Sequence, residues 1–457
     1  MSALALILVK RGYKVSGSDS KASNTTSKLI KNGIKIFETQ CSSNIHKISI
    51  YEPLIVISSA ISQDNPELKE AYKADLKIYH RSDILASLVN KQPSIIVAGS
   101  HGKTTTSTII STLFKLTHND PTIIVGGIVP IYKSNANNGK GKFLIAEGDE
   151  SDGTLIKFKP EIGVITNLEL DHTDHYENID CLIETMKIFE ENTEQLLVNF
   201  DCDVLRQNFS KKAIWLSIQN KDIANYAAIP VSTKGSETIA SFYEKGEYID
   251  EIIIPLPGLH NLSNALSAIA TCRLAGISFS ELKDHLKSIM NPLRRFEFQG
   301  IWEGKQLVDD YAHHPSEIKA TISMARLMIN SNDSILPEKS ERLIVVFQPH
   351  RFSRTKDFLK DFCHELGKAD LLLLAPIYSS GEKPIDGINS KLIACCIKEE
   401  YPNLNVINSK DIKSLELLLR ENTKKNDLIL IMGAGDINSL SKKLLIKNKS
   451  NPKNITV

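Results

Sequence analysis

Short apolar runs alternate with helix-like stretches over residues 1 to 90. Apolar residues at helical spacing predict helices over 3–11, 27–32, 65–75 and 82–90, the last opened by a Ser/Asp cap. Apolar runs bounded by turn residues predict strands over 13–19, 34–38, 53–60 and 76–80. Such alternation predicts a parallel sheet covered by helices, although a βαβ unit begins with a strand and this chain begins with a helix.

The remaining chain repeats this alternation in two further segments. Strand-like runs occur at 94–98, 121–127, 142–152, 161–170, 194–201 and 213–218. The spacing becomes irregular over 236–257, and a helix over 258–276 ends at Gly276. The runs LIVVF and LILIM in the last segment are typical of central parallel strands covered on both faces. KQP at 91–93 and NPLRRFEF at 291–298 read as hinges. We therefore expect three α/β domains, over residues 1–90, 91–292 and 293–457.

The composition excludes some classes of protein but does not indicate a function. The 457 residues are 42% hydrophobic and 24% charged, and the formal net charge is +1, so charge gives no case for a nucleic-acid or membrane-surface partner. The seven cysteines form no CxxC pair, which favours a reducing cytoplasm. No apolar run reaches the roughly 18–20 residues that span a bilayer. Lys10 and Arg11 follow the first apolar run instead of preceding it, which argues against a signal peptide.

GSHGKTTT, at residues 99–106, lies between a Val/Ile strand and a helix, the context that a phosphate-binding loop requires. Gly99 and Gly102 let backbone N–H groups approach phosphate oxygens, and the helix N-terminus adds its positive dipole end. Lys103 can reach the β- and γ-phosphates, and the Thr104 hydroxyl can ligate Mg²⁺. An ordinary glycine turn would leave the lysine and three threonines unexplained, so the segment predicts ATP binding, although its spacing is shorter than GxxxxGK[ST].

Two acidic segments follow predicted strands. In AEGDESDGT, Glu147 stands at the carboxyl end of a strand, where α/β sheets place ligands, and can complete an Mg²⁺ shell with the loop threonine. Taken alone, an acidic loop is more often only solvated. NLELDHTDHYEN carries His172 and His175 at a spacing that also suits zinc. No third soft ligand stands nearby, so an oxygen-rich magnesium site is favoured.

Two loops of the last segment, VDDYAHHPSE and FQPHRFSRT, gather histidine, arginine and aspartate after strands. Arg351 and Arg354 are placed to hold a carboxylate, because guanidinium binds carboxylates in a bidentate manner. A basic surface turn is an equal alternative on the residues alone.

The motifs, taken in order, resemble those of the Mur ligases. They are GSHGKTTT, EGDESD, LDHTDHY, LPGLHNLSNA, RRFEFQG, DDYAHHP, FQPHRFSRT and GAGDI, and the resemblance runs from residue 1 to about 440. It implies an N-terminal Rossmann-like domain, a central P-loop ATPase-like domain and a C-terminal Rossmann-like domain. FQPHRFSRT and IYSSGEKPIDGI (377–388) resemble the members that add L-alanine more than those that recycle a tripeptide onto the same sugar nucleotide.

The resemblance implies a cytoplasmic ligase that uses ATP and Mg²⁺ to join L-alanine to the carboxylate of UDP-N-acetylmuramate. The reaction proceeds through an acyl phosphate, releases ADP and phosphate, and belongs to peptidoglycan precursor synthesis. Beyond these two substrates it implies no nucleic-acid or membrane partner, and a monomer or weak homodimer.

The resemblance also assigns residues. Catalysis falls to Lys103, Glu147 and His172, and the metal ions to Thr104, Glu147 and His172. The ATP site takes Gly99, Ser100, His101, Gly102, Lys103, Thr104, Thr105, His260, Asn261, Asn264, Arg295 and Asp310, with the histidine and asparagines near adenine, the arginine on phosphate and the aspartate near the ribose. The amino-acid end takes Tyr311, His313, His350, Arg351 and Arg354, and the UDP-sugar takes Asp19, Ser58 and Ser59.

The chain departs from the family pattern at its start. Met1 to Ala5 align only with the MSxLA end of a glycine-rich GxGGxGMSxLA turn, so we expect the first, inner strand of the N-terminal sheet to be missing. Two alternatives follow from this: a catalytically impaired nucleotide-binding relic, or a start that lies inside a longer reading frame. An in-frame GxGGxG segment upstream of Met1 would support the second alternative.

Overall fold

The computed structural model describes residues 1–19, 22–150, 153–171, 176–209 and 212–449. The chain forms two compact units. Unit 1 comprises Met1–Leu170, Asn178–Leu216 and Ser267–His285, and unit 2 comprises Asp171–Glu177, Ser217–Leu266 and Leu286–Val457. The chain passes between the two units at several points, one of which falls inside helix α9 (Leu259–Leu274).

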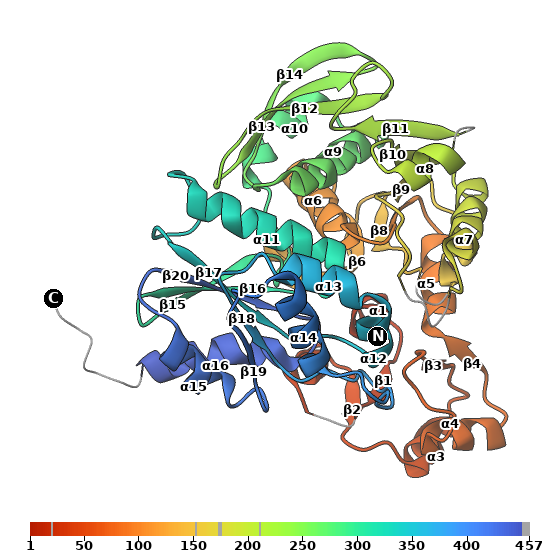
Figure 1. Ribbon diagram of the computed structural model, residues 1–457. Coiled ribbons are helices and arrows are strands. Elements are labelled where there is room, and N and C mark those ends of the chain that lie inside the picture. Colours follow the sequence, from red (N-terminus) through yellow and green to blue (C-terminus); the bar gives the residue numbers. More distant parts are fainter. Residues whose placement is uncertain (20–21, 151–152, 172–175, 210–211, 450–457) are drawn as a thin grey trace. The chain divides into compact units, whose positions relative to one another are not determined.

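The first 90 residues of unit 1 contain two small parallel sheets (Figure 1). The elements are α1 (Ser2–Lys10), β1 (Ser16–Ser18), α2 (Asn24–Lys31), β2 (Lys35–Phe37), α3 (Ser42–Ser49), β3 (Ile55–Ile57), α4 (Pro66–Lys73), β4 (Ile78–His80) and α5 (Arg81–Val89). β1 pairs with β2, and β3 pairs with β4. All the predicted elements are present, but the strands are shorter than predicted and α3 was not expected. The missing inner strand stays a prediction.

Helix α5 begins one residue earlier than the Ser/Asp signal suggests. Its N-cap is His80, whose backbone N–H donates to the Asp83 carboxylate at 2.9 Å while its ring accepts from the Ser82 N–H. Asp83 therefore caps the helix from inside the first turn rather than from the N-cap position.

The rest of unit 1 is built on a larger sheet with the strand order β11-β10-β9-β5-β8-β6-β7. Its strands are β5 (Ser94–Ala98), β6 (Thr122–Val129), β7 (Ser134–Asn137), β8 (Leu144–Glu147), β9 (Ile162–Ile165), β10 (Gln195–Asn199) and β11 (Ala213–Ser217). Its helices are α6 (Lys103–Leu116), η1 (Pro130–Tyr132), η2 (Thr154–Lys157), α7 (Ile179–Asn192), α8 (Asp203–Asn208) and α10 (Phe279–Lys283). β7 is antiparallel to its neighbour β6. β5 is fully buried between β8 and β9 and parallel to both, so the carboxyl ends of these three strands meet at one edge.

Unit 2 contains an antiparallel hairpin group and a six-stranded sheet. The hairpin group is β12 (Tyr226–Thr233), β13 (Thr238–Glu244) and β14 (Glu247–Ile254). β13 and β14 occupy the region over 236–257 where the sequence pattern looked irregular, and β12 precedes it. The sheet has the order β15-β16-β20-β17-β18-β19, with β15 (Glu297–Trp302), β16 (Lys305–Asp310), β17 (Arg342–Phe347), β18 (Leu371–Leu374), β19 (Val406–Asn408) and β20 (Asp427–Met432). The runs predicted to be central, β17 and β20, are adjacent inner strands.

Helices cover both faces of this six-stranded sheet (Figure 1). They are α11 (Pro315–Asn330), α13 (Leu359–Leu366), α14 (Ser390–Glu400), α15 (Leu415–Asn422), η4 (Asp436–Asn438) and α16 (Ser439–Lys449). Of the other helices in unit 2, η3 (Leu286–Ser288) contacts β14 and α12 (Phe352–Asp357) contacts α13. Alternate residues of β17 point to opposite faces: Val345 packs with α11, α13 and α14, whereas Ile344 packs with α15 and α16. Burial on both faces explains why β17 reads as a continuous apolar run.

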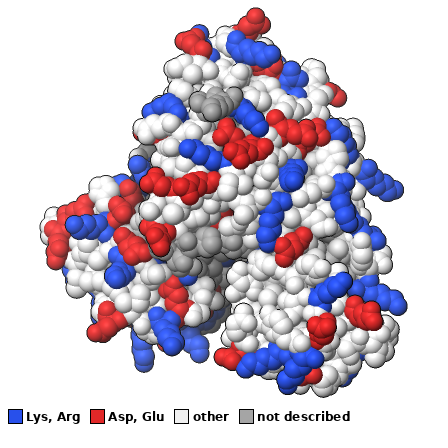
Figure 2. Space-filling model, turned by 90° about the vertical axis from the view of Figure 1, so that its right-hand side faces the viewer, with Lys and Arg blue, Asp and Glu red and all other residues white. Residues whose placement is uncertain are grey.

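Other expectations can be compared with the described residues. Helix α9 ends at Leu274, and Gly276 adopts a positive φ of 92°, as expected of a glycine beyond a helix C-terminus. Among the residues described, no helix has the length and apolar character to cross a bilayer. All seven cysteines are free. Acidic and basic side chains are interspersed on the face shown in Figure 2, in keeping with the formal net charge of +1.

Candidate active site

The phosphate loop between β5 and α6 has a shape that only glycine permits at its first position. Gly99 has a φ of 118°, and a Cβ atom there would lie 2.4 Å from Thr166 Oγ1 and 2.8 Å from the carbonyl oxygen of Asn167. Gly102 is the N-cap of α6, with a φ of 85°. The sequence therefore places glycine where the loop passes against the end of β9 and where it turns into the helix.

Asn167, which follows β9, fastens this loop. Its carbonyl oxygen accepts from the Ser100 N–H at 3.0 Å, and its Oδ1 accepts from the His101 N–H at 2.9 Å. The Thr166 hydroxyl donates to the His101 carbonyl at 2.6 Å. The Ser100 and His101 N–H groups of the predicted ATP-binding loop thus bind protein oxygens. This favours Gly102 and the N-terminus of α6 as the part of the loop that would meet an anion.

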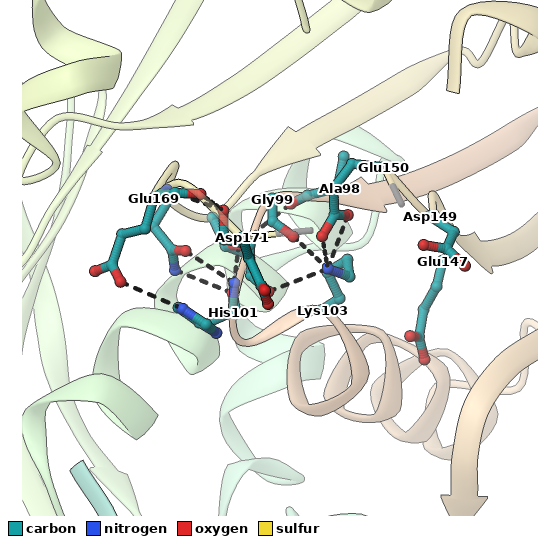
Figure 3. Close-up of polar contacts among 12 residues, drawn as sticks. Ala98, Gly99, His101, Lys103, Glu147, Asp149, Glu150, Glu169 and Asp171 are labelled. Carbon is teal, nitrogen blue, oxygen red and sulfur yellow. Dashed lines mark hydrogen bonds and ion pairs between the residues drawn. The ribbon is translucent and has the colours of Figure 1, made fainter. Parts of the chain in front are cut away.

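Lys103, the first residue of α6, points toward Glu150 (Figure 3). Its Nζ lies 2.8 and 2.9 Å from the two carboxylate oxygens of Glu150, and it also donates to the carbonyl oxygens of Gly99 at 2.5 Å and Ser100 at 3.1 Å. The side chain of Glu150 is 3% exposed. Burial lowers the pKa of Lys103, but the charge and hydrogen bond of Glu150, together with the charges of Asp149 and Glu147, outweigh it, so the pKa is raised and the ammonium stays charged.

Glu147, at the carboxyl end of β8, lies beside the loop threonine with which it was predicted to share a metal ion. The Thr104 hydroxyl donates to Glu147 Oε2 at 2.9 Å. Glu147 Oε1 accepts from the Gly126 N–H at 2.6 Å and from the Ser107 hydroxyl at 3.3 Å. The carboxylate is therefore held in one orientation next to a hydroxyl, an all-oxygen pair of the kind that Mg²⁺ prefers.

Further acidic groups in unit 1 have basic partners. Asp149 forms an ion pair with Arg81 at 2.6 Å. His101 Nε2 lies 3.4 Å from Glu169 Oε2, so this predicted ATP-site histidine turns toward a carboxylate. His172 and His175 lie outside the described residues.

A cavity of about 570 Å³ lies in unit 2 beside the start of α9. It is lined by Thr233, Gly258, Leu259, His260, Ser316, Lys319, Ala320, Ser323, Met324 and Leu327. Of the three residues predicted near adenine, His260 lines the cavity. Asn261 is 3% exposed and donates to the Pro257 carbonyl at 2.8 Å, while Asn264 is 8% exposed. A mostly apolar wall with a few polar groups suits a planar heterocycle.

Arg295 and Asp310 are tied to the fold in unit 2. Arg295 donates to Glu317 at 3.1 Å. Asp310 is 4% exposed, and its two carboxylate oxygens accept from the backbone N–H groups of Phe296 and Ala312, each at 2.7 Å. Burial raises the pKa of Asp310 to about 6 against the opposing effect of the positive charge of Arg295. Both oxygens therefore hold the start of β15 and the loop after β16.

The residues predicted for the amino-acid end come together at the carboxyl ends of β16 and β17. The ring of His313 packs edge-on against Tyr311 and against His350, with ring centroids 5.4 and 5.5 Å apart. The His350 ring stacks on Tyr378, with centroids 5.7 Å apart and an angle of 13° between the planes. The sequence did not predict a role for Tyr378.

The two predicted carboxylate-binding arginines of this cluster both carry acidic partners. Arg354 is 4% exposed, and its Nη2 lies 2.5 Å from Asp171 Oδ1. Arg351 Nε lies 2.7 Å from Glu382. Arg351 also has a φ of 72° and a ψ of 141°, a conformation that costs a residue other than glycine about 1–3 kcal/mol. Such strain persists only where surrounding contacts maintain it.

His350 should give the protein a measurable acid sensitivity. Burial, helped by the charges around it, lowers the pKa of His350 from 6.5 to about 3. Below pH 6.5 the imidazole is therefore protonated in the unfolded chain but not in the folded protein. The free energy of unfolding falls with the pH in this range, by up to about 1.4 kcal/mol per pH unit. We expect His350→Phe to reduce this slope in urea unfolding at pH 7, 6 and 5, whereas half-exposed His285→Phe should leave it unchanged. Equal slopes for His350→Phe and the parent would contradict the assignment.

The residues predicted for the UDP-sugar lie at strand ends in the first part of unit 1. The exposed Asp19 follows β1, and Ser58 and Ser59 follow β3. The Ser59 hydroxyl lies 3.1 Å from His80 Nε2. These positions belong to two separate two-stranded sheets, each at the carboxyl end of a parallel strand, which is where such sheets bind ligands.

These features define a nucleotide-dependent ligase of the Mur type, and the chain belongs to the Mur ligase family. Three models of that family match it: the Mur ligase family catalytic domain over residues 1–93, the Mur ligase middle domain over 97–272, and the Mur ligase glutamate ligase domain over 294–435. The fold is the three-domain α/β fold of these enzymes.

Individual relatives are similar over nearly their whole length. The chain is 54% identical to the UDP-N-acetylmuramate–L-alanine ligase of a strain of Prochlorococcus marinus, with 98% of this chain and 96% of the relative covered. The crystal structure of the UDP-N-acetylmuramate-alanine ligase of Thermotoga maritima matches with a TM-score of 0.82 at 25% identity, covering 98% and 96% of the two chains. A murein peptide ligase of Psychrobacter arcticus shares the fold, with a TM-score of 0.71 at 20% identity over 100% and 97% of the chains.

Proposed function

We propose that this enzyme is an ATP-dependent ligase that joins L-alanine to the carboxylate of UDP-N-acetylmuramate, in peptidoglycan precursor synthesis. The observation that carries the proposal is 54% identity to an alanine-adding relative over 98% of the chain, with Lys103, Thr104 and Glu147 held together at the phosphate loop. The tripeptide-recycling alternative has weaker support, since the murein peptide ligase likeness is at 20% identity and speaks for the fold alone.

The proposed chemistry needs charge neutralisation and positioning rather than a protein nucleophile. A carboxylate oxygen of the muramoyl group attacks the γ-phosphorus of ATP, and ADP leaves. The amine of L-alanine then attacks the carbonyl carbon, the bond from that carbon to the phosphate oxygen breaks, and the amine proton passes to solvent. Lys103, released from Glu150, neutralises the phosphoryl group in transfer.

The residues of the phosphate loop fit a magnesium ion. Thr104 and Glu147 would hold Mg²⁺, which supplies positive charge to the phosphate oxygens, and His172 is proposed for a second metal. The remaining ATP roles stay as proposed from the family resemblance. They are Gly102 and Thr105 at the phosphates, His260, Asn261 and Asn264 at adenine, Arg295 on phosphate and Asp310 near the ribose.

The amino-acid end is proposed at the cluster of Tyr311, His313, His350, Arg351 and Arg354. Burial lowers the pKa of both His313 and His350, so both rings are neutral at pH 7 and the arginines supply the positive charge for the alanine carboxylate. Neutral imidazoles also leave an acceptor for an incoming ammonium group. Asp19, Ser58 and Ser59 are proposed for the UDP-sugar.

We further propose the division into domains at 1–90, 91–292 and 293–457, a cytoplasmic location and a monomer or weak homodimer. Size-exclusion chromatography with light scattering over a range of concentrations tests the last of these. A stable trimer or larger assembly at micromolar concentration would contradict it.

The function is tested directly by phosphate release from purified enzyme with UDP-N-acetylmuramate, ATP and Mg²⁺. L-Alanine should support the fastest release, glycine and L-serine slower release, and L-alanyl-γ-D-glutamyl-meso-diaminopimelate the least. Release with the tripeptide alone would establish the recycling activity instead. No release with any acceptor, from protein that unfolds cooperatively, would indicate a catalytically impaired relic.

Glu147→Gln should raise the Mg²⁺ concentration needed for half-maximal activity by about 10- to 100-fold, because an amide replaces a charged ligand. A magnesium titration at saturating ATP measures this. Glu161→Gln is the matched control, since Glu161 pairs with the exposed Lys142 and lies just before β9, at the opposite end of the strands. An unchanged magnesium midpoint would remove Glu147 from the metal site.

A further inference from the structure

We propose that Glu382 is a positioning residue for the amino-acid substrate: it holds Arg351 and the start of α12 in the orientation that binds the substrate carboxylate. This inference rests on the proposed function, which places Arg351 at the amino-acid end. Glu382 lies outside every motif used above to assign a site role, in the loop after β18.

Glu382 makes four contacts with three consecutive residues. One carboxylate oxygen accepts from the backbone N–H groups of Phe352 at 2.7 Å and Ser353 at 3.1 Å. The other accepts from the Ser353 hydroxyl at 2.6 Å and lies 2.7 Å from Arg351 Nε. The side chain is 18% exposed, so these contacts are largely shielded from water. A single carboxylate thereby fixes both the backbone after Arg351 and its guanidinium group.

The same loop holds the backbone before Arg351. The Arg351 N–H donates to the Tyr378 carbonyl at 2.8 Å, and the Tyr378 N–H donates to the Pro349 carbonyl at 2.8 Å. Tyr378 also stacks on the His350 ring. The segment from Tyr378 to Glu382 therefore contacts every residue from Pro349 to Ser353, through backbone, ring or carboxylate.

These contacts explain how Arg351 remains in a conformation that favours glycine. With φ at 72° and ψ at 141°, its backbone is strained. Glycine would relieve the strain but remove the guanidinium group, so the arginine is retained and the loop maintains the conformation. Without Glu382, the backbone can relax toward negative φ, which would redirect the Arg351 side chain away from its present position.

A purely structural role makes a different prediction. If Glu382 acted only as a cap, its loss would destabilise α12, a helix of six residues, and affect all substrates alike. If Glu382 positions Arg351, its removal should weaken the binding of the amino-acid substrate and leave the binding of ATP nearly unchanged. Desolvation by burial opposes the charged form of Glu382, but the hydrogen bonds from Ser353 and Phe352 and the charge of Arg351 together lower its pKa, so the carboxylate is ionised near neutral pH.

The test compares Glu382→Ala and Glu382→Gln with Glu399→Ala, an exposed glutamate on α14. Glu382→Ala should raise the KM for L-alanine about 10- to 100-fold, the range that misplacement of a substrate-binding group produces, with the KM for ATP changed less than about twofold. Glu382→Gln keeps one acceptor oxygen and should lie between Glu382→Ala and the parent. Ser353→Ala removes one hydrogen bond, keeps the fold, and should raise the KM for L-alanine by a smaller factor. Glu399→Ala should match the parent.

A double-mutant cycle separates this inference from the function on which it rests. If Glu382 acts through Arg351, Arg351→Ala and Arg351→Ala/Glu382→Ala should have the same KM for L-alanine. Independent, multiplied effects, or an unchanged KM for L-alanine in both Glu382→Ala and Ser353→Ala, would overturn the inference. An unchanged KM for L-alanine in Arg351→Ala, in protein that still releases phosphate, would instead overturn the assignment of Arg351 to the amino acid.

Discussion

Lys103→Ala is expected to lower kcat for phosphate release about 10³-fold, the loss seen when one preorganised charge-stabilising donor is removed from a transition state. The substitution removes the ammonium group of the phosphate loop, which the loop carbonyls and Glu150 hold in place. Initial rates of phosphate release at saturating substrates measure the effect, with kcat and the KM for ATP determined separately.

Two further variants serve as controls for this prediction. Lys115→Ala removes a lysine from the far end of the same helix, where it pairs with Asp120 at the surface, and should leave kcat unchanged. Lys103→Met/Glu150→Gln removes both members of the ion pair, so that no buried carboxylate is left without its partner, and should be as inactive as Lys103→Ala. If either Lys103 variant retained a kcat within tenfold of the parent, the role of Lys103 in phosphoryl transfer would be wrong.

Glu150→Gln is expected to lower the free energy of unfolding of the nucleotide-free protein by about 3 kcal/mol, because it leaves the ammonium of Lys103 without its buried counter-charge. Lys103 and Glu150 are 17% and 3% exposed, so solvent screens the pair weakly. ATP phosphates can replace the lost negative charge. The increase in Tm on adding a non-hydrolysable ATP analogue with Mg²⁺ should therefore be larger for Glu150→Gln than for the parent.

Denaturant unfolding without nucleotide and thermal unfolding with it measure the two halves of this prediction. Glu161→Gln, whose partner Lys142 is 60% exposed, should change stability by less than about 1 kcal/mol. A Glu150→Gln protein as stable as the parent, or one with a smaller nucleotide-induced increase in Tm, would show that Glu150 does not hold Lys103 before nucleotide binds.

The phosphate loop was predictable because its signal is local. A buried strand, two glycines, a lysine and a hydroxyl-rich helix follow one another along a short stretch of chain, and the structure has β5, the loop and α6 in that order. The pairing of Thr104 with Glu147 needed only one further step, because carboxyl ends of adjacent parallel strands meet at one edge of a sheet.

The partner of Lys103 could not be predicted in the same way. EGDESD offers several carboxylates close together, and neither periodicity nor charge says which one faces the lysine. The structure assigns Glu147 to the threonine, Asp149 to Arg81 and Glu150 to Lys103. These choices depend on the path of the backbone after β8, which is set by tertiary contacts.

Ion pairs between residues far apart in the chain could not be predicted from the sequence for a related reason. Arg354 and Asp171 are 183 positions apart, and Arg351 and Glu382 belong to loops after different strands. The three strands β12 to β14 were also missed, because β14 begins with exposed residues and the hairpin lacks a clean alternation. Fold class followed from the run of strands and helices, whereas contacts between loops required the coordinates.

The attachment of the phosphate loop to Asn167 has a consequence for hydrogen exchange. The Ser100 and His101 amides donate to protein acceptors, so their exchange with solvent deuterium should be slow before ATP is added and change little afterwards. The helix-start amides of Gly102 and Lys103 should gain protection when phosphate binds. The loop therefore has its binding conformation before ATP arrives. Its conformational entropy is lost when the protein folds, so ordering the loop does not reduce the affinity for ATP.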